Sequence, residues 1–280
     1  MPTRGEARAR ATAALRAAGI TSPALDADVL LAHALGVPKE SLVAHPEVAL
    51  SAADADRFDA LVTRRATGVP VAYLRGSKEF YGLPFAVDPR VLVPRPETEA
   101  LVDAVRAFVA HRALTVVDVG TGAGAIAIAL AVHEPQLRII ATDISAEALA
   151  VARANALANQ VQVEFRDGDL LTPITELVDV VAANLPYLRE DALEGLAGDR
   201  TSLAFEPRLA TVAGADGLAL IRRAAADLQR VLAPGGAAFF ECDPPQVRAI
   251  RALLGPSTEV IRDLAGAERV VALRCAPGRT

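Results

Sequence analysis

The chain has 280 residues, of which 52% are hydrophobic and 22% are charged, and its formal net charge is −5 at pH 7. This composition is typical of a globular protein with a large core, organised as one large domain or two smaller ones. The acidic balance argues against a nucleic-acid substrate, because proteins that bind mainly by neutralising phosphates usually carry the opposite charge.

Residues 1–75 are predicted to form a small helical domain, because apolar residues recur there at helical spacing and no strand pattern is present. The helical stretches are 5–19, 23–36 and 52–68. Segments that contain proline or glycine separate them, as in the loops of a small bundle. Basic side chains of this domain, such as Arg64, Arg65 and Arg75, are expected on a solvated face.

Residues 76–96 differ from the helical part, because they combine aromatic and β-branched residues with glycine and several prolines. This composition predicts a short β-hairpin with its turn at residues 81–84. We expect the hairpin to link the helical domain to the rest of the chain.

From residue 97 to residue 280, strand patterns alternate with helical ones. The expected helices are 97–112, 124–134, 146–160, 217–233 and 245–255. The expected strands are 114–120, 137–143, 161–167, 178–184, 235–243, 258–263 and 268–274. The early strands are continuous apolar runs, which is typical of parallel strands buried on both faces. The alternation predicts a doubly wound α/β sheet that binds its ligands at the carboxyl ends of the strands.

A glycine-rich turn follows the first of these strands. It consists of Gly120, Thr121, Gly122, Ala123 and Gly124. Glycines allow a tight turn and a close approach of a ligand, and the helix that follows offers free N–H groups at its start. Asp143 ends the next strand, where its carboxylate can accept hydrogen bonds from both ribose hydroxyls of a nucleoside. The turn also satisfies a loose dinucleotide fingerprint, so NAD and S-adenosylmethionine are both open as cofactors at this point.

Asp169 and Leu170 follow the third strand and belong to the same edge of the predicted sheet. Two interpretations are open for them. They flank the adenine of the cofactor, or they form a simple turn that contains an aspartate.

Four residues with a distinctive chemistry follow the fourth strand: Asn184, Leu185, Pro186 and Tyr187. The carboxamide oxygen of Asn184 and the backbone carbonyl of Leu185 can accept both hydrogens of an uncharged planar –NH2 group. Pro186 fixes the chain direction, and the ring of Tyr187 can pack on the flat face of the target group. No strong base is needed, because a sulfonium methyl donor leaves as a neutral thioether and alignment supplies most of the catalysis. A hydride-transfer enzyme has no evident use for these residues, which favours S-adenosylmethionine over NAD as the cofactor. The alternative interpretation of the four residues is an asparagine cap followed by a proline turn, without a role in catalysis.

Over nearly its whole length the chain resembles the release-factor glutamine methyltransferases of the HemK/PrmC type. The resemblance includes the helical N-terminal part, "PVAYLRGSKEFYGLPFAVDPRVLVPRPETEALV", "DVGTGAGAIAIAL", "FEPRLATVAGADGL" and "RDLAGAERVV". The segment "LVPRPETE" is much more specific than any glycine-rich turn. The resemblance implies a Rossmann-like S-adenosylmethionine-dependent methyltransferase with a mostly parallel sheet. It also implies N5-methylation of the glutamine in the Gly-Gly-Gln motif of peptide chain release factors.

The same resemblance implies roles for parts of this chain. Residues 1–75 would recognise the substrate, 76–96 would be the linker and 97–280 the methyltransferase domain. The residues implied in cofactor binding are Gly120 to Gly124, Asp143, Leu170 and Asn184. Asn184 to Tyr187 would hold the glutamine side chain.

Leu185 departs from the family, which usually has Asn-Pro-Pro-Tyr at this place. The role expected of this position is a backbone carbonyl, so the chemistry should survive the change. However, Asn-Leu-Pro-Tyr is also similar to the motif of ribosomal RNA adenine dimethyltransferases, which keeps an N6-adenine methyltransferase acting on RNA or DNA open as an alternative. An NAD-dependent oxidoreductase and a cofactor-binding module without catalysis are further alternatives.

Cysteine and histidine usage predicts neither a disulfide framework nor a metal site. The two cysteines, Cys242 and Cys275, are far apart, and the four histidines are scattered. The N-terminus lacks the pattern of a signal peptide, and no apolar run approaches the ~18 residues that span a bilayer. We expect a monomeric cytoplasmic protein without a membrane association.

Overall fold

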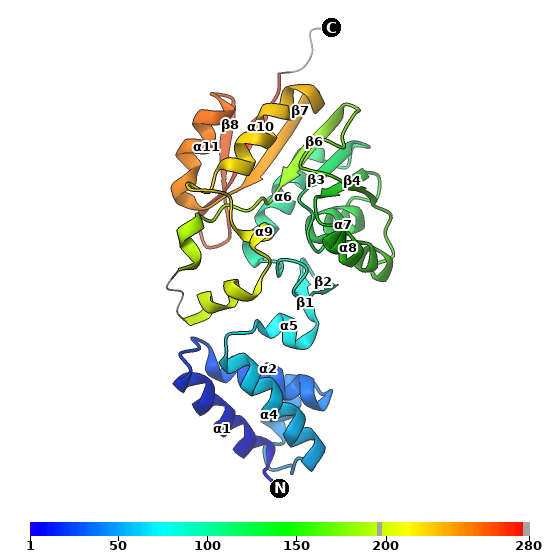
Figure 1. Cartoon of the computed structure of the whole chain (residues 1–280). Coiled ribbons are helices and arrows are strands. Elements are labelled where there is room, and N and C mark those ends of the chain that lie inside the picture. Colours follow the sequence, from blue (N-terminus) through cyan, green and yellow to red (C-terminus); the bar gives the residue numbers. More distant parts are fainter. Residues whose placement is uncertain (195–197, 277–280) are drawn as a thin grey trace. The chain divides into compact units, whose positions relative to one another are not determined.

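The computed structural model describes residues 1–194 and 198–276 (Figure 1). Residues 195–197 and 277–280, which fall in the predicted 97–280 domain, lie outside the described residues. The chain divides into two compact units. The first, here called the helical unit, is Met1–Ser77 with Leu193–Glu206, and the second, the sheet unit, is Lys78–Ala192 with Pro207–Thr280.

The helical unit packs short helices around one apolar core, as the spacing of its apolar residues predicts. Its helices are α1 (Arg4–Ala17), α2 (Pro23–Leu35), α3 (Lys39–Ala44), α4 (Ala52–Ala66), α5 (Val71–Arg75) and the 3-10 helix η3 (Gly198–Phe205). Leu15, Leu30 and Phe58 are fully buried in this core. Helix α1 begins with a capping box, in which the Thr3 hydroxyl accepts a hydrogen bond from the Glu6 amide and the Glu6 carboxylate accepts one from the Thr3 amide.

Arg65 is not on a solvated face, and this part of the sequence prediction is wrong. The residue is only 4% exposed. Its Nε donates to Oδ2 of Asp26 at 2.7 Å, and its Nη1 donates to the carbonyl of Gly68 and to the hydroxyl of Ser202. The guanidinium tolerates burial because Asp26, the Gly68 carbonyl after α4 and the Ser202 hydroxyl all accept hydrogen bonds from it.

The predicted hairpin is present. It consists of β1 (Ser77–Phe80) and β2 (Leu83–Ala86), which form a two-stranded sheet. The two residues between them, Tyr81 and Gly82, have φ of +53° and +74°, as a tight two-residue hairpin turn requires. The amide of Tyr81 donates to the Glu99 carboxylate at 3.0 Å, which ties the hairpin to the first helix of the sheet unit.

Seven strands of the described residues form one sheet in the order β5-β4-β3-β6-β7-β9-β8. The strands are β3 (Thr115–Val119), β4 (Arg138–Asp143), β5 (Glu164–Asp167), β6 (Val178–Ala183), β7 (Leu232–Glu241), β8 (Thr258–Arg262) and β9 (Glu268–Arg274). All neighbours from β5 to β7 pair in parallel, whereas β9 is antiparallel to both β7 and β8. The prediction of a mostly parallel α/β sheet is therefore confirmed.

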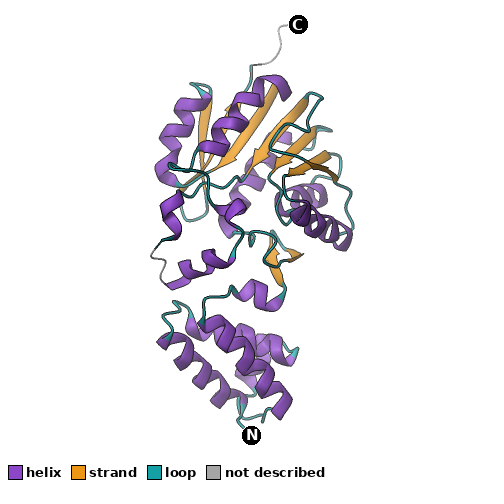
Figure 2. Ribbon diagram, in the orientation of Figure 1, coloured by secondary structure: helices purple, strands orange, loops and turns teal. Residues whose placement is uncertain are grey.

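Helices cover both faces of the sheet (Figure 2). The longer ones are α6 (Glu99–Val109), α7 (Ala125–His133), α8 (Ala146–Ala158), α10 (Ala219–Val231) and α11 (Val247–Leu254). Short helical turns lie between them: η1 (Pro96–Thr98), η2 (Glu190–Leu193), α9 (Arg208–Thr211) and η4 (Pro244–Gln246). The central strands β3 and β6 are almost entirely buried, which explains their continuous apolar sequences.

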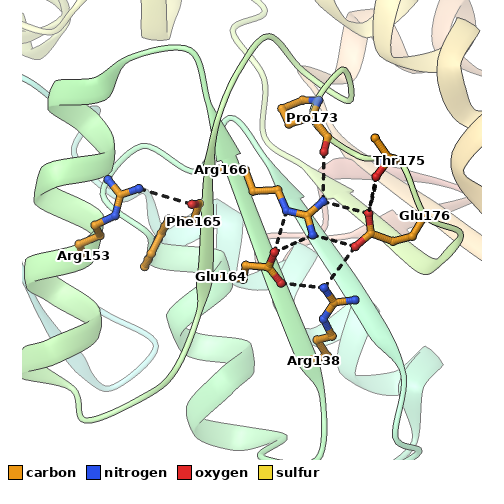
Figure 3. Close-up of polar contacts among 8 residues, drawn as sticks. All are labelled: Arg138, Arg153, Glu164, Phe165, Arg166, Pro173, Thr175 and Glu176. Atoms are coloured by element: carbon orange, nitrogen blue, oxygen red, sulfur yellow. Dashed lines mark hydrogen bonds and ion pairs between the residues drawn. The ribbon is translucent and has the colours of Figure 1, made fainter.

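Charged side chains protect the β5 edge of the sheet (Figure 3). The Arg166 guanidinium lies 2.6 Å from the Glu164 carboxylate and 2.7 Å from that of Glu176, and Arg138 pairs with both acids. The hydrogen bonds from Arg166 hold the pKa values of Glu164 and Glu176 below their usual range. An ionic network of this kind discourages pairing of the open edge with another chain.

Candidate active site

Four parallel strands, β3, β4, β5 and β6, end at the same edge of the sheet, and the segments that follow them contribute to the lining of a cavity of about 200 Å³. Most of the residues predicted from the sequence lie in its wall: Gly120, Gly122, Asp143, Asp169, Leu170, Asn184, Leu185 and Pro186. Four others are outside the lining set: Thr121, Ala123, Gly124 and Tyr187. All these lining residues belong to the sheet unit.

The glycine-rich turn after β3 takes a conformation that suits glycine. Gly120 and Gly122 have φ of +73° and +55°. A Cβ atom on Gly120 would lie only 3.1 Å from the side chain of Leu185, so the turn and the segment after β6 approach each other closely. The amides of Gly120 and Thr121 both donate to the Thr142 carbonyl, at 2.8 and 2.9 Å, which fixes the turn against the end of β4.

Asp118, which was not among the residues predicted from the sequence, fixes the glycine-rich turn through hydrogen bonds. Its Oδ2 accepts the Thr121 hydroxyl at 2.6 Å and the Ala127 amide at 3.2 Å. The carboxyl is fully buried, and burial raises its pKa to about 7 against the opposing effect of these two donors. Asp118 lies inside an apolar strand pattern, so the signal available in the sequence was a lone acid in a buried run.

Asp143 lies in the cavity wall at the end of β4, and backbone amides hold its carboxylate. Oδ2 accepts from Gly122 at 2.9 Å, and Oδ1 accepts from Ser145 at 2.9 Å. Burial raises the pKa of Asp143. Each oxygen keeps a lone pair, so a carboxylate fixed in this way can accept the two hydroxyl groups of a ribose.

Asp169 and Leu170 both lie in the cavity wall. Leu170 has a positive φ of +52°, and its carbonyl accepts the Thr142 hydroxyl at 2.9 Å. The Asp169 carboxylate pairs with Arg223, another lining residue. Because Asp169 is already paired with Arg223, its carboxylate contributes shape and polarity to the cavity wall but no unpaired charge.

Asn184 begins the segment after β6, and its amide is held from behind the cavity. Nδ2 donates to the Thr98 hydroxyl at 3.0 Å. Neither the Asn184 Oδ1 nor the Leu185 carbonyl accepts a hydrogen bond from the part of the chain that the structure describes. The site therefore offers two acceptors, an amide oxygen and a backbone carbonyl, on consecutive lining residues.

The side chain of Leu185 is 2% exposed and packs toward the glycine-rich turn, whereas Pro186 is half-buried in the wall. The Tyr187 carbonyl accepts a hydrogen bond from Gln246 at 3.0 Å, which fixes the segment at its far end. Burial, with Glu241 and Asp243 nearby, raises the pKa of Tyr187, so its hydroxyl stays protonated.

Within residues 1–194 and 198–276 no group of three or more His, Cys, Asp or Glu side chains is placed to hold a metal ion. None of the helices in these ranges combines the length and the apolarity needed to cross a bilayer.

Comparison with known proteins gives consistent matches over most of the chain. Residues 6–76 match the PrmC N-terminal domain and residues 97–201 the methyltransferase small domain. The release factor glutamine methyltransferase of Koribacter versatilis is 38% identical over 92% of this chain and 93% of its own length. That of Moorella thermoacetica is 40% identical over 94% and 95%. Among solved structures, the 16S rRNA N2 methyltransferase RsmC of T. thermophilus, in complex with AdoMet and guanosine, matches with a TM-score of 0.51 at 17% identity. The match covers 71% of this chain and 49% of the RsmC chain, and it shows a likeness of fold.

Proposed function

The chain belongs to the family of release factor glutamine methyltransferases, and we propose that the cavity at the carboxyl edge of its sheet is the active site. It is an S-adenosylmethionine-dependent methyltransferase whose substrate is a glutamine of peptide chain release factors. We propose that this glutamine is the one in the Gly-Gly-Gln motif. The observation that carries the assignment of the site is the pair of unused acceptors on Asn184 and Leu185.

The cofactor is proposed to bind beside the glycine-rich turn. The wall at Gly120 and Gly122 has no side chains, and Asp143 presents two fixed carboxylate oxygens next to it. These groups suit the ribose of S-adenosylmethionine, with Asp169 and Leu170 toward the adenine. When bound, this cofactor supplies a methyl group on a positively charged sulfur, which departs as a neutral thioether.

The catalytic role of Asn184 and Leu185 follows from the chemistry of an amide. The nitrogen of a glutamine side chain is a poor nucleophile because its lone pair is delocalised into the carbonyl. Two acceptors that hold both of its hydrogens fix the nitrogen in line with the methyl group and favour its change toward tetrahedral geometry. After transfer, the nitrogen is acidic enough to lose one proton to a weak acceptor. Pro186 and Tyr187 are proposed to shape the site around the flat amide.

The leucine at position 185 is compatible with this role. A backbone carbonyl is present whatever the side chain, and the Leu185 side chain points into the core rather than displacing the acceptor. Relatives that are 38–40% identical over more than nine-tenths of this chain are release factor glutamine methyltransferases, so an adenine methyltransferase is not favoured.

The N-terminal residues 1–75 are proposed to recognise the release factor, with 76–96 as linker and 97–280 as the catalytic domain. The match of residues 6–76 to the PrmC N-terminal domain supports the first of these assignments. We propose a monomer that acts in the cytoplasm, where release factors work.

Transfer of a labelled methyl group tests the proposed function. The purified chain is incubated with labelled S-adenosylmethionine and either a purified release factor or ribosomal RNA. We expect label in the protein fraction alone, and none in a release factor whose Gly-Gly-Gln glutamine is replaced by alanine. Label in the RNA would favour the adenine methyltransferase instead.

A further inference from the structure

Two buried residues behind the cavity have no role in the function described so far. Thr98 is 4% exposed and Glu241 is 1% exposed, and neither belongs to the cavity wall. Thr98 ends η1 and precedes α6, and Glu241 is the last residue of β7. Ala183 and Phe240 are partners in the pairing of β6 with β7, so the next residues, Asn184 and Glu241, leave adjacent strands at the same level.

The Thr98 hydroxyl contacts Asn184 and Glu241 and does not cap its own helix. Threonine at this position usually caps the helix that follows, but the Thr98 side chain makes no such hydrogen bond to α6. Its oxygen instead accepts a hydrogen bond from the Asn184 Nδ2 at 3.0 Å, and its hydroxyl lies near the Glu241 carboxyl, where it favours the charged form of that acid. The three polar side chains form a row that ends at Asn184 in the cavity wall.

The Thr98 hydroxyl has a single hydrogen, and the ionised form of Glu241 can only accept a hydrogen bond. In that form of Glu241, the hydrogen of Thr98 points toward the carboxylate. The Thr98 lone pair then faces Asn184 and selects its –NH2 group. The amide oxygen of Asn184 is left for the cavity, where a glutamine –NH2 group needs an acceptor. With the opposite amide orientation, the site would present two donors to the substrate nitrogen.

Burial of the Glu241 carboxyl costs folding free energy that an apolar side chain packed in its place would not cost. Within the described residues its Oε2 has no hydrogen-bond partner, although the atom is inaccessible to solvent. Burial raises its pKa to about 7, while Thr98, Arg269 and Arg95 favour the charged form and Glu97 opposes it. A buried acceptor of this kind costs folding free energy, so its presence calls for a role, and one at the site is at hand.

We propose that Thr98 and Glu241 are positioning residues that fix the Asn184 amide with its oxygen toward the substrate nitrogen. The inference rests on the proposed function of Asn184. Thr98 and Glu241 touch neither substrate nor cofactor, and they act through the orientation of one amide group. In the sequence, Thr98 belongs to the "LVPRPETE" segment, which is thereby connected to catalysis.

Three variants test the proposal in the full chain. Thr98→Val keeps the branched shape and removes the hydroxyl, and we expect kcat to fall about 10- to 100-fold, with KM for the release factor and the cofactor Kd changed by less than about twofold. Thr98→Ser restores the hydroxyl and should recover kcat to within about threefold. Glu241→Gln should cost less than Thr98→Val, and the double variant should be no slower than Thr98→Val, because both changes remove the same restraint.

A second readout does not depend on methyl transfer. The side-chain amide signal of Asn184 is observed by NMR in chain labelled with nitrogen-15 at asparagine, and is assigned by its loss in Asn184→Asp. We expect Thr98→Val to shift and broaden this signal and Thr98→Ser to leave it near its original position. An unchanged amide signal in Thr98→Val, or equal losses of kcat in Thr98→Val and Thr98→Ser, would overturn the proposal. If the unsubstituted chain methylates no release factor, the proposed function fails, and the amide signal still decides the positioning role.

Discussion

Asn184 and Thr98 are 86 positions apart in the sequence, and the amide nitrogen of one lies 3.0 Å from the hydroxyl oxygen of the other. This contact joins the segment after β6 to the start of α6. It directs the nitrogen of Asn184 toward Thr98, which is outside the cavity wall, and leaves the oxygen for the substrate amide that we propose to bind there. The orientation of a single amide thus decides whether the site accepts or repels an –NH2 group.

Asp143→Ala is expected to weaken cofactor binding. The substitution removes two fixed carboxylate oxygens from the cavity wall, and the Kd for S-adenosylmethionine should rise at least about tenfold. Isothermal titration calorimetry measures this change. Asp227→Ala is a matched control, because Asp227 pairs with Arg230 on α10 and does not line the cavity. An equal Kd in the two variants would rule out the proposed ribose contact.

Two glycines of one turn should respond differently to alanine. A Cβ on Gly122 would meet no atom of the chain within 4 Å, so Gly122→Ala should fold with a strain of about 1 kcal/mol and lose cofactor affinity where the methyl group enters the wall. A Cβ on Gly124 would lie 2.8 Å from the Ile128 side chain, so Gly124→Ala should mainly lower Tm. Measurement of Tm and of cofactor Kd for both variants separates the two effects. A larger fall in Tm for Gly122→Ala than for Gly124→Ala would contradict the different roles proposed for the two glycines.

Leu185→Pro restores the first proline of the pattern usual in the family and should keep catalysis. The backbone carbonyl remains, and within the described residues the Leu185 amide donates no hydrogen bond that proline would remove. We expect kcat within about threefold of the unsubstituted chain, with a loss of about 1 kcal/mol of stability from the buried apolar side chain. Steady-state kinetics and urea unfolding measure the two quantities. A loss of kcat like that of an Asn184 variant would show that the leucine side chain itself takes part.

Asp118 should make stability depend on pH. Its pKa is raised from 3.8 to about 7 in the folded chain, so its stabilising contribution is complete below about pH 4 and is lost as the pH rises to about 7. The loss amounts to about 4 kcal/mol at most, at 1.36 kcal/mol per pH unit. Asp118→Asn keeps an oxygen for Thr121 and Ala127 but does not titrate, so the difference in unfolding free energy between the two proteins should change over this range. Urea unfolding at pH 4.5 and pH 7.5 tests this, and a difference that is independent of pH would contradict the assignment.

The sequence predicted the regular elements of the sheet unit well, because their patterns are strong and local. Strands β3 and β6 are continuous apolar runs, and the alanine-rich helices α7 and α8 follow β3 and β4. Short helices such as α3, α5 and α9 were missed, since four to six residues are too few to show a period. Strand β5 begins at Glu164, later than expected, because the Val161 amide still closes the end of α8.

The candidate site was predictable where its residues follow strands, and not where they lie behind it. Gly120, Asp143 and Asn184 come at strand ends, and the carboxyl ends of parallel strands meet at one edge. The roles of Thr98 and Glu241 depend on strand order and on a contact across 86 residues, which no local pattern encodes. The burial of Arg65 depends in the same way on a distant segment, through Ser202.

Mass spectrometry of methyl groups on a release factor tests whether Asn184 catalyses methylation of the Gly-Gly-Gln glutamine. The factor is incubated with S-adenosylmethionine and the unsubstituted chain, Asn184→Ala, or Asn159→Ala, whose asparagine binds two backbone carbonyls on α8 and the hairpin instead of lining the cavity. We expect one methyl group on the Gly-Gly-Gln glutamine, formed at least about 100-fold more slowly by Asn184→Ala and at an unchanged rate by Asn159→Ala. A methyl group on another residue, or an undiminished rate with Asn184→Ala, would contradict this expectation.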